Sequence, residues 1–326
     1  MTAQDALEAA DASRFQKRLL GWFDRNKRDL PWRRDRDPYR VWLSEIMLQQ
    51  TRVAAVTDHY HKFLRRFPTI EKLASARESS VLAAWSGLGY YRRARMLHAA
   101  AKKIVKEHGG KLPETAEGLR ALPGIGRYTA SAIASIAFDE PVAVVDGNVE
   151  RVLQRVHGKN LAGENLWRSA EELLSRRRPG DFNQAMMELG ATVCLPRQPQ
   201  CPLCPVSELC ATRGERPRPA QRTRQTKREI RYALSFRDGA IFMVQRSKAA
   251  TLMPGMWELP EIAGANGSTA GWLTLRHSIT VTDYVVRVVA GPAPAGLAGR
   301  WVQTSRLSTL PLTGLARKIL RAAEII

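Results

Sequence analysis

The stretch CLPRQPQCPLCPVSELC, residues 194–210, contains every cysteine of the chain, namely Cys194, Cys201, Cys204 and Cys210. Four cysteines this close together in a protein of a reducing compartment indicate a metal site rather than disulfides. Their thiolates could bind one zinc ion tetrahedrally or hold an iron–sulfur cluster. A single Cys-x-x-Cys pair with longer, unequal arms, in a loop that its prolines keep out of regular helix, favours the cluster.

On the N-terminal side of this loop, apolar residues recur at helical spacing, which predicts an all-helical block. The expected helices cover about residues 14–30, 39–61, 78–86, 91–108, 116–122, 127–137, 149–156, 164–176 and 181–191. We therefore expect a mainly α domain over residues 1–212 that ends with the cysteine loop.

On the C-terminal side, the composition changes. Residues 213–229 are rich in Arg, Lys and Pro, and we expect an exposed linker there, either a solvated hinge or a basic strap on DNA. Residues 230–326 should form a small α+β domain. Its expected elements are strands at 240–244 and 284–289 and a helix near 314–324.

The charge of the chain points to a polyanionic partner. Its 326 residues include 51 Lys and Arg against 31 Asp and Glu, a formal net charge of +20. Nucleic acid is the first expectation and an anionic membrane surface the second. No apolar run approaches the roughly 20 residues that span a bilayer. The polar N-terminal segment resembles neither a signal nor a transit peptide. We therefore expect a cytoplasmic, nucleoid-associated monomer with no membrane partner.

A glycine-containing turn, LPGIGRYT at residues 122–129, separates two of the expected helices. Gly124 and Gly126 could let backbone N–H groups turn outward at the start of the second helix and bind a DNA phosphate. The same residues also suit an ordinary helix–helix turn with a glycine C-cap.

Two carboxylic acids stand out from their surroundings. Glu45 is a lone acid in the apolar stretch WLSEIML, where burial would raise its pKa, although most helical Glu side chains are solvated. Asp146 follows the apolar run VAVV and precedes a helix, as an N-cap does, and the N–H groups of the helix start would keep it ionised. Asn148 could orient it. A protonated acid and an ionised carboxylate are the pair that glycosidic-bond cleavage requires.

Several motifs together resemble one family. The spacing C-x6-C-x2-C-x5-C resembles the 4Fe-4S loop of endonuclease III and of the MutY-type adenine DNA glycosylases, and the turn resembles their helix-hairpin-helix. SEIMLQQTRV, AVVDGNVERVL and LGYYR resemble MutY signatures. The resemblance implies a helix-hairpin-helix glycosylase fold in which the four cysteines are ligands of a structural 4Fe-4S cluster that assists DNA engagement.

The resemblance also implies roles for site residues. Glu45 would protonate adenine at N7 and then activate water, while Asp146, assisted by Asn148, would stabilise the oxocarbenium ion. Bifunctional relatives carry a Schiff-base Lys where this chain has Tyr128, and a phenol cannot form an imine. Tyr128 would instead support the two carboxylates.

Contacts with DNA follow from the same motifs. Gln50 and Tyr90 would wedge into the base stack when adenine flips out, and Arg92 belongs to the same DNA-binding motif. The alternative for Tyr90 is an ordinary core aromatic.

The C-terminal part resembles the Nudix-related domain that reads oxidised guanine in MutY proteins. Its PGMWELP stretch at 254–260 resembles the GLWEFP-like stretch of that domain. The metal-binding REXXEE box of active Nudix enzymes is absent from the sequence, which implies binding without hydrolysis. The loop RHSITV at 276–281 departs from the family's Phe-Ser-His pattern. Thr280 keeps a hydroxyl, and His277 is either a lesion contact or a strand-surface imidazole.

The implied function is excision of adenine paired with 8-oxoguanine or G in double-stranded DNA. Three alternatives are an endonuclease III-like pyrimidine glycosylase with lyase activity, a non-catalytic iron–sulfur DNA-binding protein, and a Nudix-type nucleotide hydrolase. Tyr128 and Glu45 disfavour the first, and the missing box disfavours the last.

Overall fold

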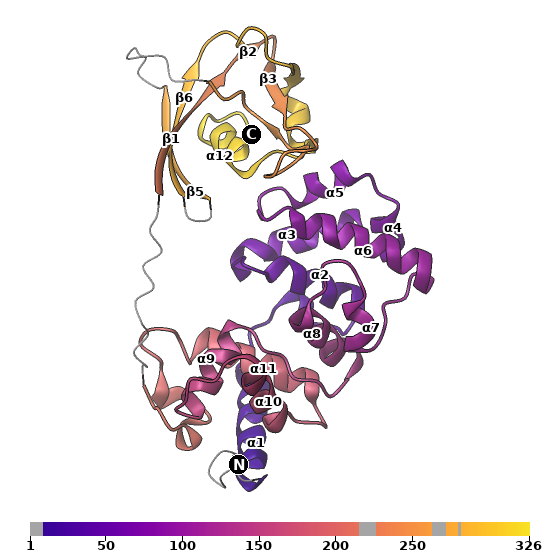
Figure 1. The fold of residues 1–326 in the computed structure, drawn as a ribbon, viewed down its shortest axis with the longest axis vertical. Coiled ribbons are helices and arrows are strands. Elements are labelled where there is room, and N and C mark those ends of the chain that lie inside the picture. Colours follow the sequence, from indigo (N-terminus) through magenta and orange to yellow (C-terminus); the bar gives the residue numbers. More distant parts are fainter. Residues whose placement is uncertain (1–8, 215–225, 263–271, 280–281) are drawn as a thin grey trace. The chain divides into compact units, whose positions relative to one another are not determined.

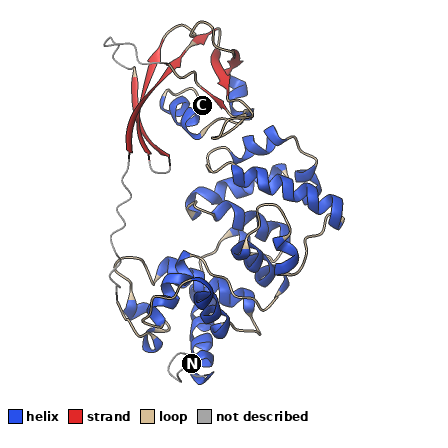
Figure 2. Ribbon diagram, in the orientation of Figure 1, coloured by secondary structure: helices blue, strands red, loops and turns tan. Residues whose placement is uncertain are grey.

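The computed structural model describes residues 9–214, 226–262, 272–279 and 282–326. In these residues helices dominate up to the cysteine loop, and strands follow from Thr226 onward (Figure 2). Contacts divide the chain into two compact units. One comprises Met1–Tyr60, Thr69–Glu71 and Ala99–Pro219, and the other comprises His61–Pro68, Lys72–His98 and Ala220–Ile326. The second unit includes helices that we assigned to the first domain, so the division into 1–212, 213–229 and 230–326 stays a prediction.

The first unit is built from helices. Within it lie α1 (Ala9–Asn26), α2 (Pro38–Leu48), α7 (Ala116–Arg120), α8 (Arg127–Phe138), α9 (Gly147–Val156), α10 (Gly163–Leu173) and α11 (Pro179–Thr192), with short 3-10 turns at Pro31–Arg33, Cys201–Leu203 and Ser207–Leu209. Three helices run across the division or border it: α3 (Val53–Arg66), α4 (Ile70–Ala74) and α6 (Arg92–His108).

The packing of these helices brings distant parts of the sequence together. Helices α1, α9, α10 and α11 enclose an apolar core that includes Phe15, Leu19, Leu153 and Phe182 (Figure 1). Burying a side chain of this size contributes about 1.5–3 kcal/mol. Helix α2 packs on α8, α8 packs on α11, and α11 packs on α9. This series of contacts fixes the start of α9 relative to α2.

The prediction of one helix over 39–61 was wrong, because the structure has two. Helix α2 ends at Leu48, and Gln50 adopts a left-handed conformation with φ of 55° before α3 begins at Val53. The turn is closed by a hydrogen bond from the Thr51 N–H to the Leu48 carbonyl of 3.2 Å. The sequence QQTR contains neither Gly nor Pro, so the residues alone do not indicate this break.

The second unit combines α5 (Glu78–Trp85) and α12 (Gly314–Ala322) with two sheets. One sheet has the order β1-β6-β5, with β1 and β6 parallel; the other has the order β2-β3-β4, with β7 also on β3. The strands are β1 (Thr226–Leu234), β2 (Phe236–Arg237), β3 (Ala240–Gln245), β4 (Trp257–Glu258), β5 (Leu273–Ile279), β6 (Thr282–Ala290) and β7 (Gly299–Gln303).

The strands expected at 240–244 and 284–289 and the helix near 314–324 are confirmed as β3, β6 and α12. The expected linker over 213–229 overlaps β1, which begins at Thr226; residues 215–225 lie outside the described part. Among the residues that the structure describes, no helix has the length and apolar character needed to cross a membrane.

Candidate active site

Helix α2 carries Glu45 into the interior of the first unit. The helix begins after Asp37, whose carboxylate accepts a hydrogen bond from the Arg40 N–H at 2.9 Å and so caps it. Only 6% of Glu45 is exposed, so the solvated-helix interpretation is wrong for this residue. The Tyr128 hydroxyl, near the start of α8, donates a 2.7 Å hydrogen bond to Glu45 Oε2. A residue of the glycine-containing turn thus contacts the buried acid.

This environment changes the protonation of Glu45. Burial raises its pKa from 4.5 to about 7, the hydrogen bond from Tyr128 opposes that rise, and the negative charge of Asp146 adds to it. Burial and the charge of Glu45 raise the pKa of Tyr128 well above its ordinary value, so Tyr128 remains a neutral donor. Near neutral pH, Glu45 can therefore both hold and release a proton.

Asp146 is the N-cap of α9, as the sequence predicted. Its Oδ1 accepts hydrogen bonds from the N–H groups of Asn148 at 2.9 Å and Val149 at 2.7 Å, and its Oδ2 accepts one from Asn148 Nδ2 at 2.9 Å. These donors and the N-terminal end of the helix dipole stabilise a negatively charged carboxylate. Asn148 thus holds Asp146 through both its backbone and its side chain.

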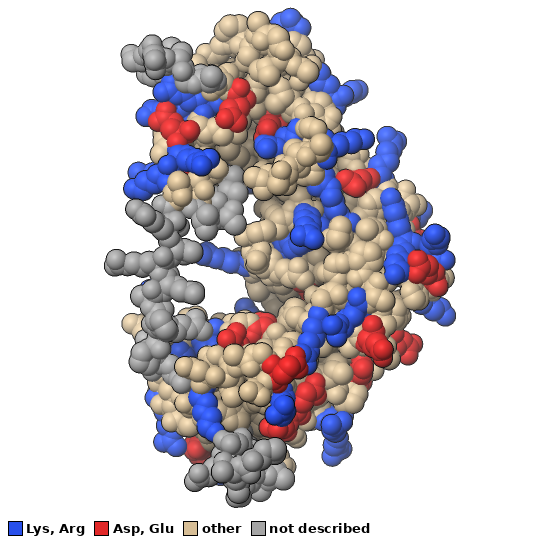
Figure 3. All heavy atoms as spheres, viewed as in Figure 1, with Lys and Arg blue, Asp and Glu red and all other residues tan. Residues whose placement is uncertain are grey.

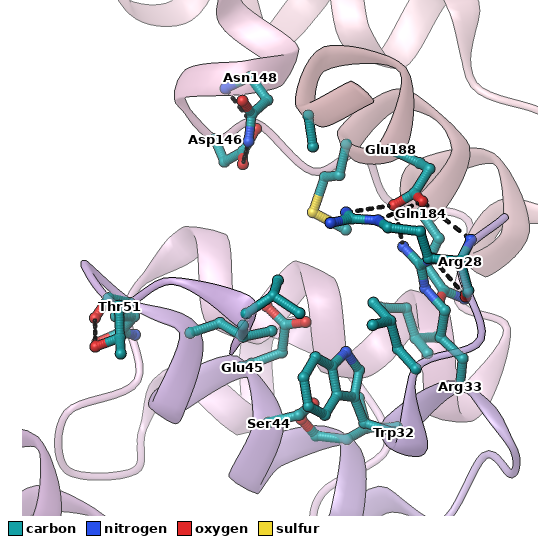
Figure 4. A pocket seen from close by; sticks show the side chains of 18 of the residues that line it. Arg28, Trp32, Arg33, Ser44, Glu45, Thr51, Asp146, Asn148, Gln184 and Glu188 are labelled. Carbon is teal, nitrogen blue, oxygen red and sulfur yellow. Dashed lines mark hydrogen bonds and ion pairs between the residues drawn. The ribbon is translucent and has the colours of Figure 1, made fainter. Parts of the chain in front are cut away.

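The two acids line one cavity of about 330 Å³, a volume at the lower end of small-molecule sites (about 300–1,000 Å³). Figure 4 shows Glu45 on one side of it and Asp146 with Asn148 on the other. Tyr128 and Gln50 also line this cavity. The carboxyl groups come from positions 101 residues apart in the sequence (146 − 45) but face a common space.

One wall of the cavity was missed by the sequence analysis. Glu188 on α11 has a fully buried side chain, and it accepts hydrogen bonds of 2.7 Å from Arg28 Nε and 2.9 Å from Arg33 Nη2 (Figure 4). Burial would raise the pKa of Glu188, but these arginines outweigh it and lower the pKa to about 2. Trp32 and Gln184 line the same cavity. Glu188 is a lone acid in the apolar stretch AMMELGA, the same sequence pattern that drew attention to Glu45.

Tyr128 of the glycine-containing turn lines this cavity, but Gly124 and Gly126 do not. Gly124 has a φ of +76°, a conformation that favours glycine, and Gly126 is the N-cap of α8 with no side-chain capping bond. A Cβ added at Gly126 would meet nothing within 4 Å. No side chain caps the first N–H groups of α8 at Gly126, and the turn makes the ordinary connection between α7 and α8.

The cysteine loop is fixed to α9 by two buried arginines. Arg155 Nη1 donates to Cys194 Sγ at 3.2 Å and to the Leu195 carbonyl at 2.7 Å. Arg151 donates to the Cys194 carbonyl and, through Nη2, to Asn148 Oδ1, each at 2.8 Å. The helix that begins at Asp146 therefore connects the loop with the cavity.

The four cysteines offer the thiolate donors that an iron–sulfur cluster or a zinc ion would need. All four are free thiols that line one small cavity. Within the described residues, no three His, Cys, Asp or Glu side chains lie close enough together to hold a single metal ion. A zinc ion would bind the thiolates at about 2.3 Å from one centre, and an iron–sulfur cluster would bind each thiolate to an iron. Burial raises the pKa of the Cys204 thiol to about 11.

Tyr90 lies in the second unit and is exposed to 53%, so the core-aromatic interpretation is wrong. It has a φ of +47° between α5 and α6, next to Gly89 with a φ of +71°. The Arg93 guanidinium lies 5.4 Å from the centre of the Tyr90 ring, and its Nη2 donates to the Gly89 carbonyl at 3.3 Å. An exposed aromatic side chain is thus held in an uncommon backbone conformation. Arg92, the first residue of α6, is also exposed.

Of the two candidate residues in the C-terminal part, one is described. His277 lies on β5 opposite Tyr284 of β6, and burial together with the charge of Lys318 lowers its pKa. Thr280 lies outside the described residues.

The helical fold and its site define a class of protein. Residues 43–175 match the HhH-GPD superfamily of base excision DNA repair proteins. A thermostable thymine-DNA glycosylase structure is 32% identical with a TM-score of 0.59, covering 62% of this chain and 96% of its own. A trapped endonuclease III–DNA intermediate has the same fold, at 21% identity and a TM-score of 0.56, covering 64% and 97%. The chain belongs to the HhH-GPD superfamily, and the predicted mainly α helix-hairpin-helix fold is confirmed.

The chain is also similar in sequence to adenine DNA glycosylases. It is 52% identical over 218 residues to the adenine DNA glycosylase of Rattus norvegicus, which is 62% of this chain and 42% of the rat protein. The resemblance to the MutY-type enzymes is thereby confirmed. The chain spans less than half the length of this relative.

Proposed function

We propose that the chain is an adenine DNA glycosylase that hydrolyses the N-glycosidic bond of adenine opposite 8-oxoguanine or G in duplex DNA. The observation that supports this most directly is the pair of acids on one cavity. Glu45, with a pKa of about 7, can carry a proton, and the N–H groups of Asn148 and Val149 donate hydrogen bonds to the Asp146 side chain. General acid–base catalysis requires this division between two groups.

In the proposed reaction, Glu45 donates its proton to N7 of the extruded adenine as the C–N bond breaks and its electron pair moves to the base. Asp146 lies beside the sugar and stabilises the positive charge that develops there, while Asn148 keeps its carboxylate in place. The ionised Glu45 then accepts a proton from the water that attacks the sugar. Tyr128 donates to Glu45 and stabilises that ionised form.

The Glu188 wall suits a purine that carries an exocyclic amino group. An ionised, fully buried carboxylate accepts hydrogen bonds, and the guanidinium groups of Arg28 and Arg33 beside it donate them. Trp32 supplies an aromatic surface on the same cavity. A pyrimidine would fill less of this space and present a different set of donors.

Other parts of the chain would bind the duplex. Lys and Arg predominate over Asp and Glu on the face seen in Figure 3, in agreement with the net charge of +20. We assign phosphate binding to the turn of Gly124 and Gly126, and base-stack contacts to Gln50 and Tyr90. Arg92 would contact the backbone, and His277 and Thr280 are the proposed lesion contacts.

We assign a 4Fe-4S cluster to Cys194, Cys201, Cys204 and Cys210. When bound, it would cross-link the loop of residues 194–210 through its thiolates. Arg155 would donate a hydrogen bond to one of those sulfurs and hold the loop against α9.

A single-turnover assay on duplexes with adenine opposite 8-oxoguanine, G or T tests this proposal. We expect adenine release from the first two and none from the third. A protein that binds duplex DNA but releases no base would be the non-catalytic alternative. A DNA–protein adduct trapped by borohydride would instead identify a lyase of the endonuclease III type, which Tyr128 disfavours because it has no amine.

A further inference from the structure

The segment that leads to Asp146 is partly buried, and it pairs with no strand among the residues that the structure describes. Residues 141–145 connect α8 to α9 and belong to no helix or strand, and Ala143 and Val144 are almost completely buried. Buried backbone N–H and C=O groups require partners, and an unpaired one costs about 1–3 kcal/mol. The Val142 N–H donates to the Glu140 carbonyl at 2.8 Å, and three of the other groups have side-chain partners.

Asn183 of α11 supplies two of them. Its side chain is only 2% exposed, its Nδ2 donates to the Val142 carbonyl at 2.9 Å, and its Oδ1 accepts from the Val144 N–H at 3.1 Å. In a β-strand, the C=O of one residue and the N–H of the second residue after it point to the same side. A neighbouring strand would bind these two groups. The Asn183 carboxamide takes the place of that neighbouring strand.

Glu171 of α10 supplies the partner on the other edge. Its Oε1 accepts a 2.8 Å hydrogen bond from the Ala143 N–H. Asn183 is itself fixed, because its Nδ2 also donates to Ser135 Oγ at 2.9 Å. The start of α11 has no room to shift, since a Cβ at Gly180 would lie 2.4 Å from the Ser135 carbonyl oxygen.

We propose that Asn183 and Glu171 are positioning residues that fix the register of residues 142–144 and thereby aim Asp146 at the cavity. Successive side chains of an extended segment point to opposite sides, so a slip of one residue would turn Asp146 away from Glu45. This inference rests on the proposed role of Asp146 in adenine release.

Four variants of the full-length holoenzyme test it, with Asp146→Asn as the reference for lost chemistry. Asn183→Leu and Glu171→Ala remove partners of the segment, whereas Glu171→Gln keeps an acceptor for the Ala143 N–H. Ser169→Ala is the matched control, because it removes a buried hydrogen bond, of 2.7 Å to His157, that does not involve the segment.

We expect Asn183→Leu and Glu171→Ala to lower the single-turnover rate at saturating enzyme by roughly tenfold or more, with unchanged affinity for the duplex. Glu171→Gln and Ser169→Ala should stay within about threefold of wild type, well below the effect of such a misplacement. Hydrogen exchange at Ala143 and Val144 should become faster in the first two variants and not in the control.

The outcomes separate the inference from the proposed function. If Asp146→Asn keeps the wild-type rate, the role of Asp146 is wrong. If Asp146→Asn is inactive while folded Glu171→Ala and Asn183→Leu keep the wild-type rate, the positioning role is overturned. If Asn183→Leu fails to fold, the positioning role is tested by comparing Glu171→Ala with Glu171→Gln. Equal rates in those two variants overturn the positioning role.

Discussion

Replacing Glu45 with Gln should stabilise the folded protein at alkaline pH. The pKa of Glu45 is raised from 4.5 to about 7 in the folded state, mainly by burial. Below pH 4.5 the carboxyl is protonated in both states and has no effect. As the pH rises, the unfolded chain releases the proton first, so wild-type stability falls until the folded pKa is passed. The resulting loss is about 1 kcal/mol at pH 5 and about 3 kcal/mol at pH 8.

Glu45→Gln has no proton to lose and can still accept the hydrogen bond from Tyr128. Its stability relative to wild type should therefore rise by about 2 kcal/mol between pH 5 and pH 8, which is roughly 4–8 °C in Tm for a unit of this size. Thermal unfolding of both proteins at the two pH values measures this difference. Glu107→Gln, at an exposed position of α6, serves as the control. A difference between Glu45→Gln and wild type that is the same at both pH values would refute the reasoning.

Three other substitutions probe the cavity and the packing of the helices beside it. Tyr128→Phe removes the hydrogen bond that lowers the pKa of Glu45, so the alkaline limb of the pH–rate profile should move to higher pH; an unmoved limb contradicts this. Arg33→Ala deprives the fully buried Glu188 of one partner, and chemical denaturation should show a loss of about 3 kcal/mol, whereas near-wild-type stability would mean that the pair is not buried as described. Gly190→Ala would place a methyl group 2.6 Å from a side-chain carbon of α9, which should cost about 1–3 kcal/mol in unfolding free energy. Unchanged stability there would contradict the close approach of α11 and α9.

Most helices could be predicted from the sequence, because apolar periodicity reports directly which face of a helix is buried. The break between α2 and α3 could not, because Gln50 adopts its left-handed conformation without a Gly or Pro that would mark it. Strand β1 was partly assigned to the linker because its first residues, Thr226 to Glu229, are polar and exposed. Local patterns also say nothing about which unit a helix joins, so the grouping of Lys72–His98 with the C-terminal part was not foreseen.

The candidate site shows the same limit. Glu45 and Asp146 stood out because each is a lone acid beside an apolar run, but their catalytic roles came from the resemblance to MutY signatures. The structure places both on one cavity. Glu188 is also a lone acid in an apolar stretch, but we assigned it only to a helix. Its partner Arg28 lies 160 residues away, and no sequence pattern connects the two residues. Asn183 gave no signal at all. Its role depends on the backbone of a segment whose lack of a neighbouring strand is visible only in three dimensions.

Single-turnover release of adenine by Glu45→Gln tests the central claim most directly. The substrate is a duplex with adenine opposite 8-oxoguanine, and affinity for the same duplex is measured in parallel. We predict a rate at least about 100-fold below that of wild type, with affinity retained, because the proton donor is gone while the cavity is intact. A wild-type rate would contradict the assignment of Glu45 as the acid that acts on the base.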